Sequence, residues 1–202
     1  MNKRSGIESK RKIIDAAMAV FSTKGYAKAS IREIAKSAGI SIGGVYIYFK
    51  NKEDLYKDII EERKSSLKDA IETTLGQTQT AAEALSAFIK LYLDYAIKHK
   101  EFIILHIREH GFSFGVHEKR QFFRKQKTLI ENIIQRGIQS GEFRECNADH
   151  MAKMIMGSLR GIILSMALDD DVHITPKMLN EFIFNGLITA GKSSQRKVGR
   201  IK

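Results

Sequence analysis

The chain has very little of several features that mark whole classes of proteins. It has a single proline in 202 residues, Pro176, so long stretches rich in Ala, Leu, Ile, Lys, Glu and Gln are free to form helices. It has a single cysteine, Cys146, which excludes an internal disulfide and fits a reducing compartment. Glycine-rich phosphate loops, cysteine pairs and nucleophile elbows are also missing, so the enzyme classes that depend on them have no support.

Long apolar runs are missing as well. The N-terminal MNKRSGIESKRK has no apolar core of a signal peptide, and no run approaches the 18 to 20 apolar residues of a membrane span. We therefore expect a cytoplasmic protein without a membrane partner. The 43% hydrophobic and 28% charged content is ordinary for a globular protein of one or two domains, and the lack of strand-period alternation predicts an all-α fold.

Positive charge is concentrated at the two ends of the chain. Residues 1–52 contain 11 Lys and Arg against 3 acids, residues 53–191 contain 18 against 20, and residues 192–202 contain 5 and no acid. A basic N-terminal module on a nearly neutral body is typical of a nucleic-acid-binding protein, with a merely solvated basic face as the alternative. The basic tail 192–202 is expected to be disordered, with contact to DNA or RNA as the lesser alternative.

Helix signals in the first fifty residues predict a helix-turn-helix. A first helix over 8–24 has its apolar residues on one face and stops at Gly25. Ser30 and Glu33 form a capping box for a short second helix that ends at Gly39. Ser41 can cap a third helix only two residues later, which would make it the recognition helix in the major groove.

The stretch GISIGGVYIYFKNKEDL contains residues that suit a recognition helix. Two glycines remove side chains where the backbone must approach DNA, and two tyrosines can offer hydroxyls to phosphates. Val45 and Phe49 are expected to face the small core that the three helices share. Asn51 can cap a long fourth helix over 52–74, which connects the basic module to the body, with Lys52 placed to hold a phosphate.

Residues 13–59 resemble the DNA-binding domain of the TetR (tetracycline-repressor) family of bacterial transcriptional regulators, with the matching features in FSTKGYAKASIREIAKSAGISIGGVYIYFKNKEDLY. The resemblance implies a helix-turn-helix domain over 1–51, a helical effector-binding and dimerisation domain over 52–191, and a basic tail over 192–202. It also implies base-edge contacts from Ile42, Gly43, Gly44 and Ile47. Phosphate contacts are implied for Ser30, Tyr46, Tyr48 and Lys52, with Ser41 and Arg32 completing the DNA-binding set.

One departure from the family pattern concerns Gly44, where Thr, Ser or Ala is more usual. With Ile42 and two glycines, the recognition helix has few hydrogen-bond donors for bases. We therefore expect readout to depend on thymine methyl groups, on DNA shape, and on Arg32 or Lys28 nearby.

Five further helices are predicted near 81–99, 101–110, 116–140, 147–168 and 175–191, about nine in all. The last two carry broad apolar stripes, and Gly157 and Gly161 would let another helix approach closely. Packing within the chain is one interpretation. The family resemblance favours the other, a homodimer through these two helices that presents two recognition helices to a palindromic operator.

The middle helices are rich in aromatic residues. Such a stripe is usually core, but the family places its ligand pocket here, which implies a repressor that a small, largely apolar effector releases from DNA. No cofactor is expected. The residues that this interpretation assigns to the pocket are Phe88, Tyr92, Tyr95, Phe102, His106, Phe122 and Phe123.

A rival hypothesis comes from His106, Glu109 and His110, which have the H-x-x-E-H spacing of an inverted zinc-protease helix. It would make the protein a metal-binding helical protein or a hydrolase, whereas histidines with a structural role are the simpler interpretation. A helical interaction scaffold without DNA binding is a third hypothesis, but it leaves the basic module unexplained. We expect neither a catalytic nor a metal site.

Overall fold

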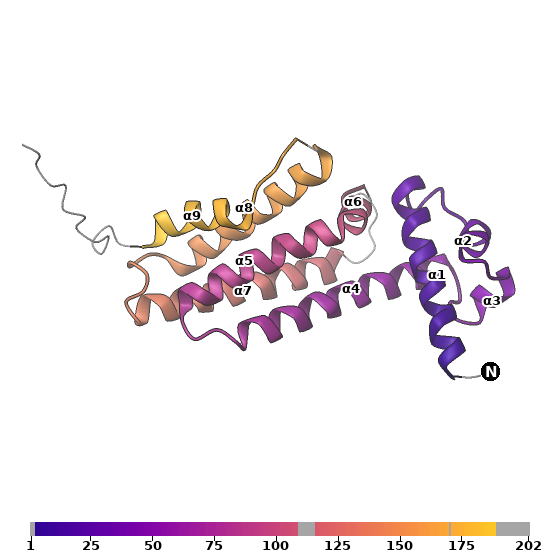
Figure 1. The fold of residues 1–202 in the computed structure, drawn as a ribbon, viewed down its shortest axis with the longest axis horizontal. Coiled ribbons are helices and arrows are strands. Elements are labelled where there is room, and N and C mark those ends of the chain that lie inside the picture. The colour runs from indigo at the N-terminus through magenta and orange to yellow at the C-terminus, as the bar shows by residue number, and fades with distance from the viewer. Residues whose placement is uncertain (1–2, 109–115, 170, 189–202) are drawn as a thin grey trace, which may run out of the picture.

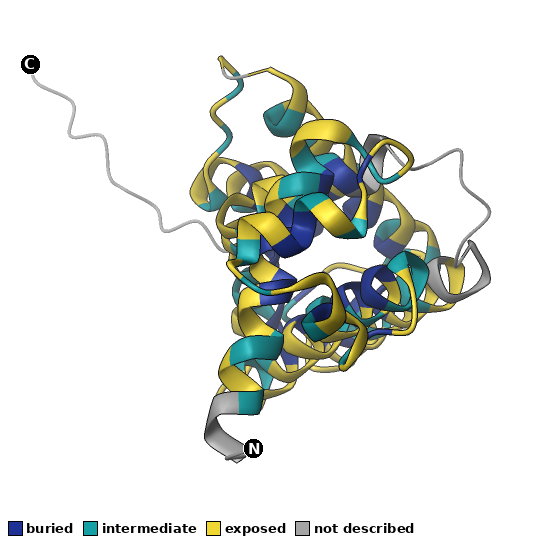
Figure 2. Ribbon diagram, turned by 90° about the vertical axis from the view of Figure 1, so that its right-hand side faces the viewer, coloured by how far each residue is buried: buried dark blue, intermediate teal, exposed yellow. Residues whose placement is uncertain are grey.

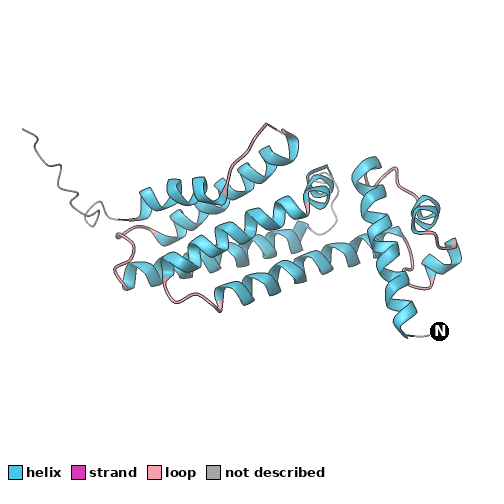
Figure 3. Cartoon of the chain, viewed as in Figure 1, coloured by secondary structure: helices cyan, strands magenta, loops and turns pink. Residues whose placement is uncertain are grey.

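The computed structural model describes residues 3–108, 116–169 and 171–188. Every secondary-structure element in these ranges is a helix (Figure 3), which confirms the all-α expectation. The helices are α1 (Lys3–Lys24), α2 (Ile31–Ala38), α3 (Ile42–Tyr46), α4 (Lys52–Leu75), α5 (Ala81–Lys98), α6 (Lys100–Arg108), α7 (Val116–Gln139), α8 (Ala148–Leu168) and α9 (Pro176–Leu187).

The molecule is elongated, with α1, α2 and α3 gathered at one end (Figure 1). Helix α4 leaves this end and runs along one side of a bundle in which α5 and α7 lie in the middle. Helices α8 and α9 lie on the side of the bundle opposite α4. We call α5 to α9, with the second half of α4, the regulatory bundle.

The predicted helix caps are confirmed. The Ser30 side chain accepts a hydrogen bond from the backbone N–H of Glu33 at 3.3 Å, and the Ser30 N–H donates back to the Glu33 carboxylate at 3.1 Å. Ser41 caps α3 at 3.0 Å and Asn51 caps α4 at 2.8 Å. Gly39 ends α2 in a left-handed conformation, with φ of 66°, that costs glycine little.

Two helix ends differ from expectation. Helix α1 begins at Lys3, five residues earlier than predicted, although Gly6 in that stretch disfavours a helix. Helix α3 ends at Tyr46, although the apolar spacing predicted that it would continue to about Phe49. Two of its five residues are glycine, and the chain turns after Tyr46 to bury Phe49, which is 1% exposed. The expected glycine break at 111–115 lies outside the described residues.

The buried side chains form two hydrophobic cores. Figure 2 colours the buried residues dark blue on the ribbon. The first core joins α1, α2 and α3 to the start of α4, and α6 adds Leu105 to it. The second fills the regulatory bundle and includes Leu67 and Ile71 of α4. Because α4 contributes to both cores, domain bounds of 1–51 and 52–191 stay a prediction.

Helix α8 is apolar on average, although Lys153 and Arg160 interrupt its apolar residues. It is the one helix in the described ranges that is long and apolar enough to cross a membrane, and 22% of that stretch is buried in the chain. Single helices of this composition also occur in the cores of soluble proteins. The feature that needs explanation is therefore its exposed apolar face.

Candidate DNA-binding surface and effector pocket

Helix α3 presents a short exposed ridge at the end of the molecule. Three large apolar or aromatic side chains lie on it: Ile42 is 43% exposed, Tyr46 is 52% exposed and Ile47 is 68% exposed. Val45 and Phe49 are buried in the first core, as predicted. The N-cap and the buried side chains hold α3 in place, and its opposite face is exposed and can contact a partner.

The two glycines of α3 have different reasons to be glycine. A Cβ at Gly43 would meet nothing within 4 Å. A Cβ at Gly44 would lie 2.7 Å from Cγ2 of Ile40 and 3.2 Å from the Ser41 hydroxyl oxygen. Close approach to DNA therefore remains a sufficient reason for Gly43 alone, whereas Gly44 is already required by packing within the turn.

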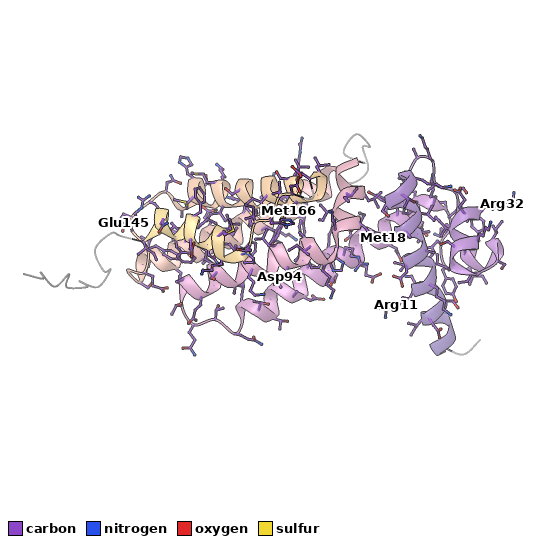
Figure 4. All side chains as sticks on the ribbon, turned by 45° about the horizontal axis from the view of Figure 1, so that its top comes forward. Arg11, Met18, Arg32, Asp94, Glu145 and Met166 are labelled. Atoms are coloured by element: carbon purple, nitrogen blue, oxygen red, sulfur yellow. The ribbon has the colours of Figure 1, made fainter. Side chains whose placement is uncertain are left out.

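Cations surround this ridge without acidic partners. Lys28, Arg32, Lys36 and Lys50 are exposed, and within the described part of the chain none of them forms an ion pair. Figure 4 shows Arg32 at the end of the molecule farthest from the regulatory bundle. Unpaired cations beside an exposed ridge make a surface suited to a polyanion.

Ser30 and Glu33 form more interactions than the capping box that the sequence predicts. The Ser30 hydroxyl donates to the Glu33 carboxylate at 3.0 Å, and the same carboxylate also binds the Lys24 ammonium. The hydrogen bond from Lys24, followed by those from Ser30, lowers the pKa of Glu33 below its ordinary value. Contact between Ser30 and a phosphate stays a prediction, because it would require this hydroxyl to exchange partners.

The half-buried Lys52 side chain is held against the backbone of the loop before α2. Its Nζ donates to three backbone carbonyl oxygens, those of Tyr26 at 2.7 Å, Ala27 at 3.2 Å and Ala29 at 2.8 Å. It also lies 4.5 Å from the centre of the Tyr26 ring. Since a lysine has three N–H donors, Lys52 ties the start of α4 to the loop before α2. Its phosphate contact stays a prediction.

An inner apolar pocket lies in the regulatory bundle at the end nearer α1. It has a volume of about 90 Å³, and α4, α5, α6, α7 and α8 all contribute to its wall. Five of the residues predicted to bind the effector are in that wall: Tyr92, Tyr95, Phe102, Phe122 and Phe123.

Phe88, also predicted to bind the effector, is not part of this wall. Phe88 is fully buried in the second core, where its ring stacks on that of Tyr92 with the ring centroids 5.4 Å apart. Helical spacing could not distinguish these two roles, because both residues lie on the buried face of α5. The side chain of His106, together with Glu109 and His110, lies outside the described residues.

Few polar groups face the inner pocket. The Tyr95 hydroxyl donates to the Arg63 carbonyl at 2.8 Å, and the Arg160 guanidinium lies 3.7 Å from the centre of the Phe123 ring. Burial raises the pKa of Tyr92 to about 12, so its phenol is neutral at physiological pH. The pocket thus favours an apolar group.

A larger groove between α4 and α7 adjoins this pocket and was missed by the sequence reasoning. It has a volume of about 700 Å³, and Lys64 and Phe122 line both cavities. Gln126 lies in its wall, is 6% exposed, and has a side-chain oxygen without a hydrogen-bond partner. A buried unpaired amide costs about 1–3 kcal/mol. The available signal was a glutamine four residues from Phe122 and Ile130 on the apolar face of α7.

Helix α6 connects the inner pocket with the first core. Phe102 and Ile103 line the pocket, while Leu105, two residues later, is fully buried among residues of the DNA-binding end. A change in the position of α6 therefore reaches the packing of α1 directly.

Among the side chains that the structure describes, which do not include those of residues 106–119, no group of three or more His, Cys, Asp or Glu could hold a metal ion.

A helix-turn-helix joined to a helical bundle with an apolar pocket defines a ligand-responsive transcriptional regulator. Residues 13–59 match the model of "Bacterial regulatory proteins, tetR family", and residues 78–164 match "Tetracyclin repressor-like, C-terminal domain". The chain belongs to the TetR family of transcriptional regulators. This family is not enzymatic, so the hydrolase hypothesis for residues 106–110 is set aside.

Some of the similar proteins are regulators of fatty acid metabolism. The chain is 28% identical over 164 residues to a fatty acid metabolism regulator protein of Bacillus subtilis, covering 80% of this chain and 84% of that protein. It is similar to the transcriptional regulator FadR from Bacillus subtilis in complex with stearoyl-CoA, with 25% identity, a TM-score of 0.72, and coverage of 86% and 95%. The fatty acid degradation regulator FadR from Bacillus halodurans has the same fold, with 23% identity, a TM-score of 0.74, and coverage of 88% and 98%.

Proposed function

We propose that this protein is a homodimeric repressor of the bacterial cytoplasm that binds a palindromic operator and is released by a fatty-acyl effector. The observation that carries the proposal is the inner apolar pocket, whose wall includes the helix that also packs into the DNA-binding core. The regulator of fatty acid metabolism and the stearoyl-CoA complex among its relatives support an acyl ligand.

The release mechanism follows from helices α4 and α6. An effector that fills the inner pocket favours those positions of Phe102 and Ile103 that accommodate it. Leu105 transmits a displacement of α6 to the first core, and α4 transmits one directly because it enters both cores. Coupling of about 1–3 kcal/mol, typical of allosteric proteins, would lower operator affinity by roughly 5- to 150-fold.

The dimer proposal rests on the outer face of α8 and α9. Each apolar stripe splits in two: one half is buried within the chain, whereas Met154, Leu168 and Phe182 are 65%, 69% and 71% exposed. A Cβ at Gly157 or at Gly161 would meet nothing within 4 Å, so neither glycine is needed by packing within the chain. A second copy on this face would bury the apolar side chains and use the open glycines.

DNA readout is proposed to come from the ridge of α3 and the cations around it. Ile42 and Ile47 offer methyl groups to thymine, while Tyr46, Tyr48 and Arg32 are proposed for phosphates and nearby base edges. We expect Tyr48→Phe to weaken binding to all sequences and Ile42→Ala to change sequence preference. Unchanged binding by both variants would contradict these assignments.

The first test is a DNA-binding selection with the full-length protein on random duplexes at two salt concentrations. We expect a palindrome whose half-sites are about 10 base pairs, or a multiple, apart, with affinity that falls steeply as salt rises. The selected duplex is then titrated with palmitoyl-CoA, palmitate and octanoate, with release followed by fluorescence anisotropy. No enriched sequence from folded protein would refute the operator proposal, and no release by any acyl compound would refute the effector proposal.

A further inference from the structure

A second apolar pocket adjoins the inner pocket on the side that faces the loop after α8. It has a volume of about 160 Å³ and lies among α5, α6, α8 and that loop. We call it the rear pocket. Besides the residues that it shares with the inner pocket, its wall contains Ile97, Lys100, Met166, Ala167, Val172 and His173. The wall is apolar apart from Lys100 and His173, and none of the residues proposed for DNA or dimer contacts belongs to it.

Two isoleucine side chains separate the inner pocket from the rear pocket. Three residues line both: Ala96 of α5, Ile103 of α6 and Ile163 of α8. Because Ala96 carries only a methyl group, Ile103 and Ile163 form most of the partition. A β-branched side chain in a helix has one strongly preferred rotamer, so neither isoleucine rotates aside at little cost. A ligand that passes from one pocket to the other must therefore move α6 and α8 apart.

Of these two helices, α6 is held less firmly. Helix α8 has 21 residues and buries four of them, from Ala152 to Leu159, in the second core. Helix α6 has nine residues, and among its described side chains Leu105 alone is buried. Since burial of apolar surface is what holds a helix in place, a ligand that separates the two helices displaces α6. Leu105 carries that displacement into the first core, where the DNA-binding helices pack.

We infer that an effector releases the protein from DNA when its apolar chain passes between Ile103 and Ile163 and ends in the rear pocket. A shorter chain ends in the inner pocket, where it binds without separating α6 from α8. The two isoleucines thus make the reach of the chain, and not binding alone, the signal for release. This inference rests on the proposed acyl effector and applies to whichever polar group the chain is attached to.

The test measures binding and release separately on the full-length protein. The compounds are octanoate, laurate and palmitate, each also as its CoA thioester, below the concentrations at which they form micelles. Isothermal titration calorimetry gives their affinities, and fluorescence anisotropy gives the operator affinity of protein saturated with each compound. We expect the octanoyl compounds to bind wild type and change operator affinity by less than about twofold, whereas the palmitoyl compounds that bind should lower it by roughly 5- to 150-fold.

Opening the partition should have opposite effects on binding and on release. Ile163→Ala lets the chain enter the rear pocket without separating the helices, so palmitoyl compounds should bind severalfold more tightly than they bind wild type. For the same reason, the variant saturated with them should lose severalfold less operator affinity than wild type does. Tighter binding together with weaker release is a combination that a simple loss of stability does not produce.

Filling the rear pocket tests the other half of the inference. Ala167 lines the rear pocket and not the inner one, so Ala167→Leu should weaken binding of the palmitoyl compounds severalfold and leave the octanoyl compounds unchanged. Ile162→Ala is the matched control for Ile163→Ala, because it makes the same truncation at the neighbouring residue of α8, outside both pockets. It should alter neither the affinities nor the release. Thermal unfolding of each variant shows whether the fold is kept.

Three results would overturn the inference in distinguishable ways. Full release of wild type by saturating octanoyl compounds would refute the reach of the chain as the signal while leaving an acyl effector in place. Binding and release in Ile163→Ala and Ala167→Leu that match those of Ile162→Ala would refute the rear pocket as the site of the chain end. Binding of none of the compounds by protein that still binds its operator would refute the proposed acyl effector itself.

Discussion

The adjacent glycines of α3 allow a matched pair of substitutions, Gly43→Ala and Gly44→Ala. Both replace glycine by alanine in the same short helix, so both gain the same intrinsic preference, at most about 1 kcal/mol. They differ only in surroundings. The new Cβ at Gly43 has open space, whereas the one at Gly44 would lie 2.7 Å from Cγ2 of Ile40, a distance that real Cβ atoms do not show.

The expected magnitudes have opposite signs. Gly43→Ala should raise the free energy of unfolding by about 0.4–1 kcal/mol, because the unfolded chain loses conformational freedom without strain in the folded state. Gly44→Ala must move Ile40, a β-branched residue with restricted χ1, and overpacking costs about 1–3 kcal/mol. The net result should be a loss of up to about 2 kcal/mol. For a chain of this size, 1 kcal/mol corresponds to about 2–4 °C in Tm.

The assay is thermal and urea unfolding followed by circular dichroism, with operator affinity measured on the same samples. Ile40→Leu removes the Cγ2 atom, so Gly44→Ala should be less harmful in that background, and the double-mutant cycle gives the coupling. Gly43→Ala should weaken operator binding although it stabilises the fold. Equal stability changes for the two alanines, or no coupling with Ile40, would refute the packing argument, and undiminished operator affinity would refute the close approach at Gly43.

Three further predictions concern other parts of the molecule. Lys52→Met should lower the free energy of unfolding, by about 1–3 kcal/mol, because three carbonyls lose a charged donor, and should weaken all DNA binding together, as measured by urea unfolding and anisotropy. Phe182→Glu should give monomers in sedimentation velocity where the wild type gives the proposed dimer; a dimer of unchanged stability would contradict the proposed α8–α9 interface. Burial raises the pKa of Tyr92 from 10.0 to about 12, so stability should be complete below pH 10 and decline by up to about 1.4 kcal/mol per pH unit between pH 10 and 12. In Tyr92→Phe this part of the alkaline loss should be absent from urea unfolding at pH 8 and 11.

Local signals in the sequence were sufficient for most of the helical architecture. The caps at Ser30, Ser41 and Asn51 are where their spacing predicted them, because a cap depends on residues only three positions apart. The buried positions Val45 and Phe49 were also predictable, since they lie on one face of one short segment. The extent of α3 was not, because burial of Phe49 in a core shared with other helices ends it early.

Roles that depend on distant segments were decided only by the tertiary structure. Lys52 could be placed at a helix start from sequence, but its three carbonyl partners are more than twenty residues away. Phe88 and Tyr92 share a helix face, and only the packing of neighbouring helices puts Tyr92 at the pocket wall and Phe88 behind it.

The sequence by itself determined the family, the helix order and the basic recognition module, because motif spacing, periodicity and charge are properties of contiguous residues. The tertiary structure decided where the cavities lie and how the inner pocket is connected to the first core. The α4–α7 groove has walls from two helices more than forty residues apart, and α6 reaches the first core through Leu105. No local pattern encodes these contacts between distant helices, because they depend on how all the helices pack together.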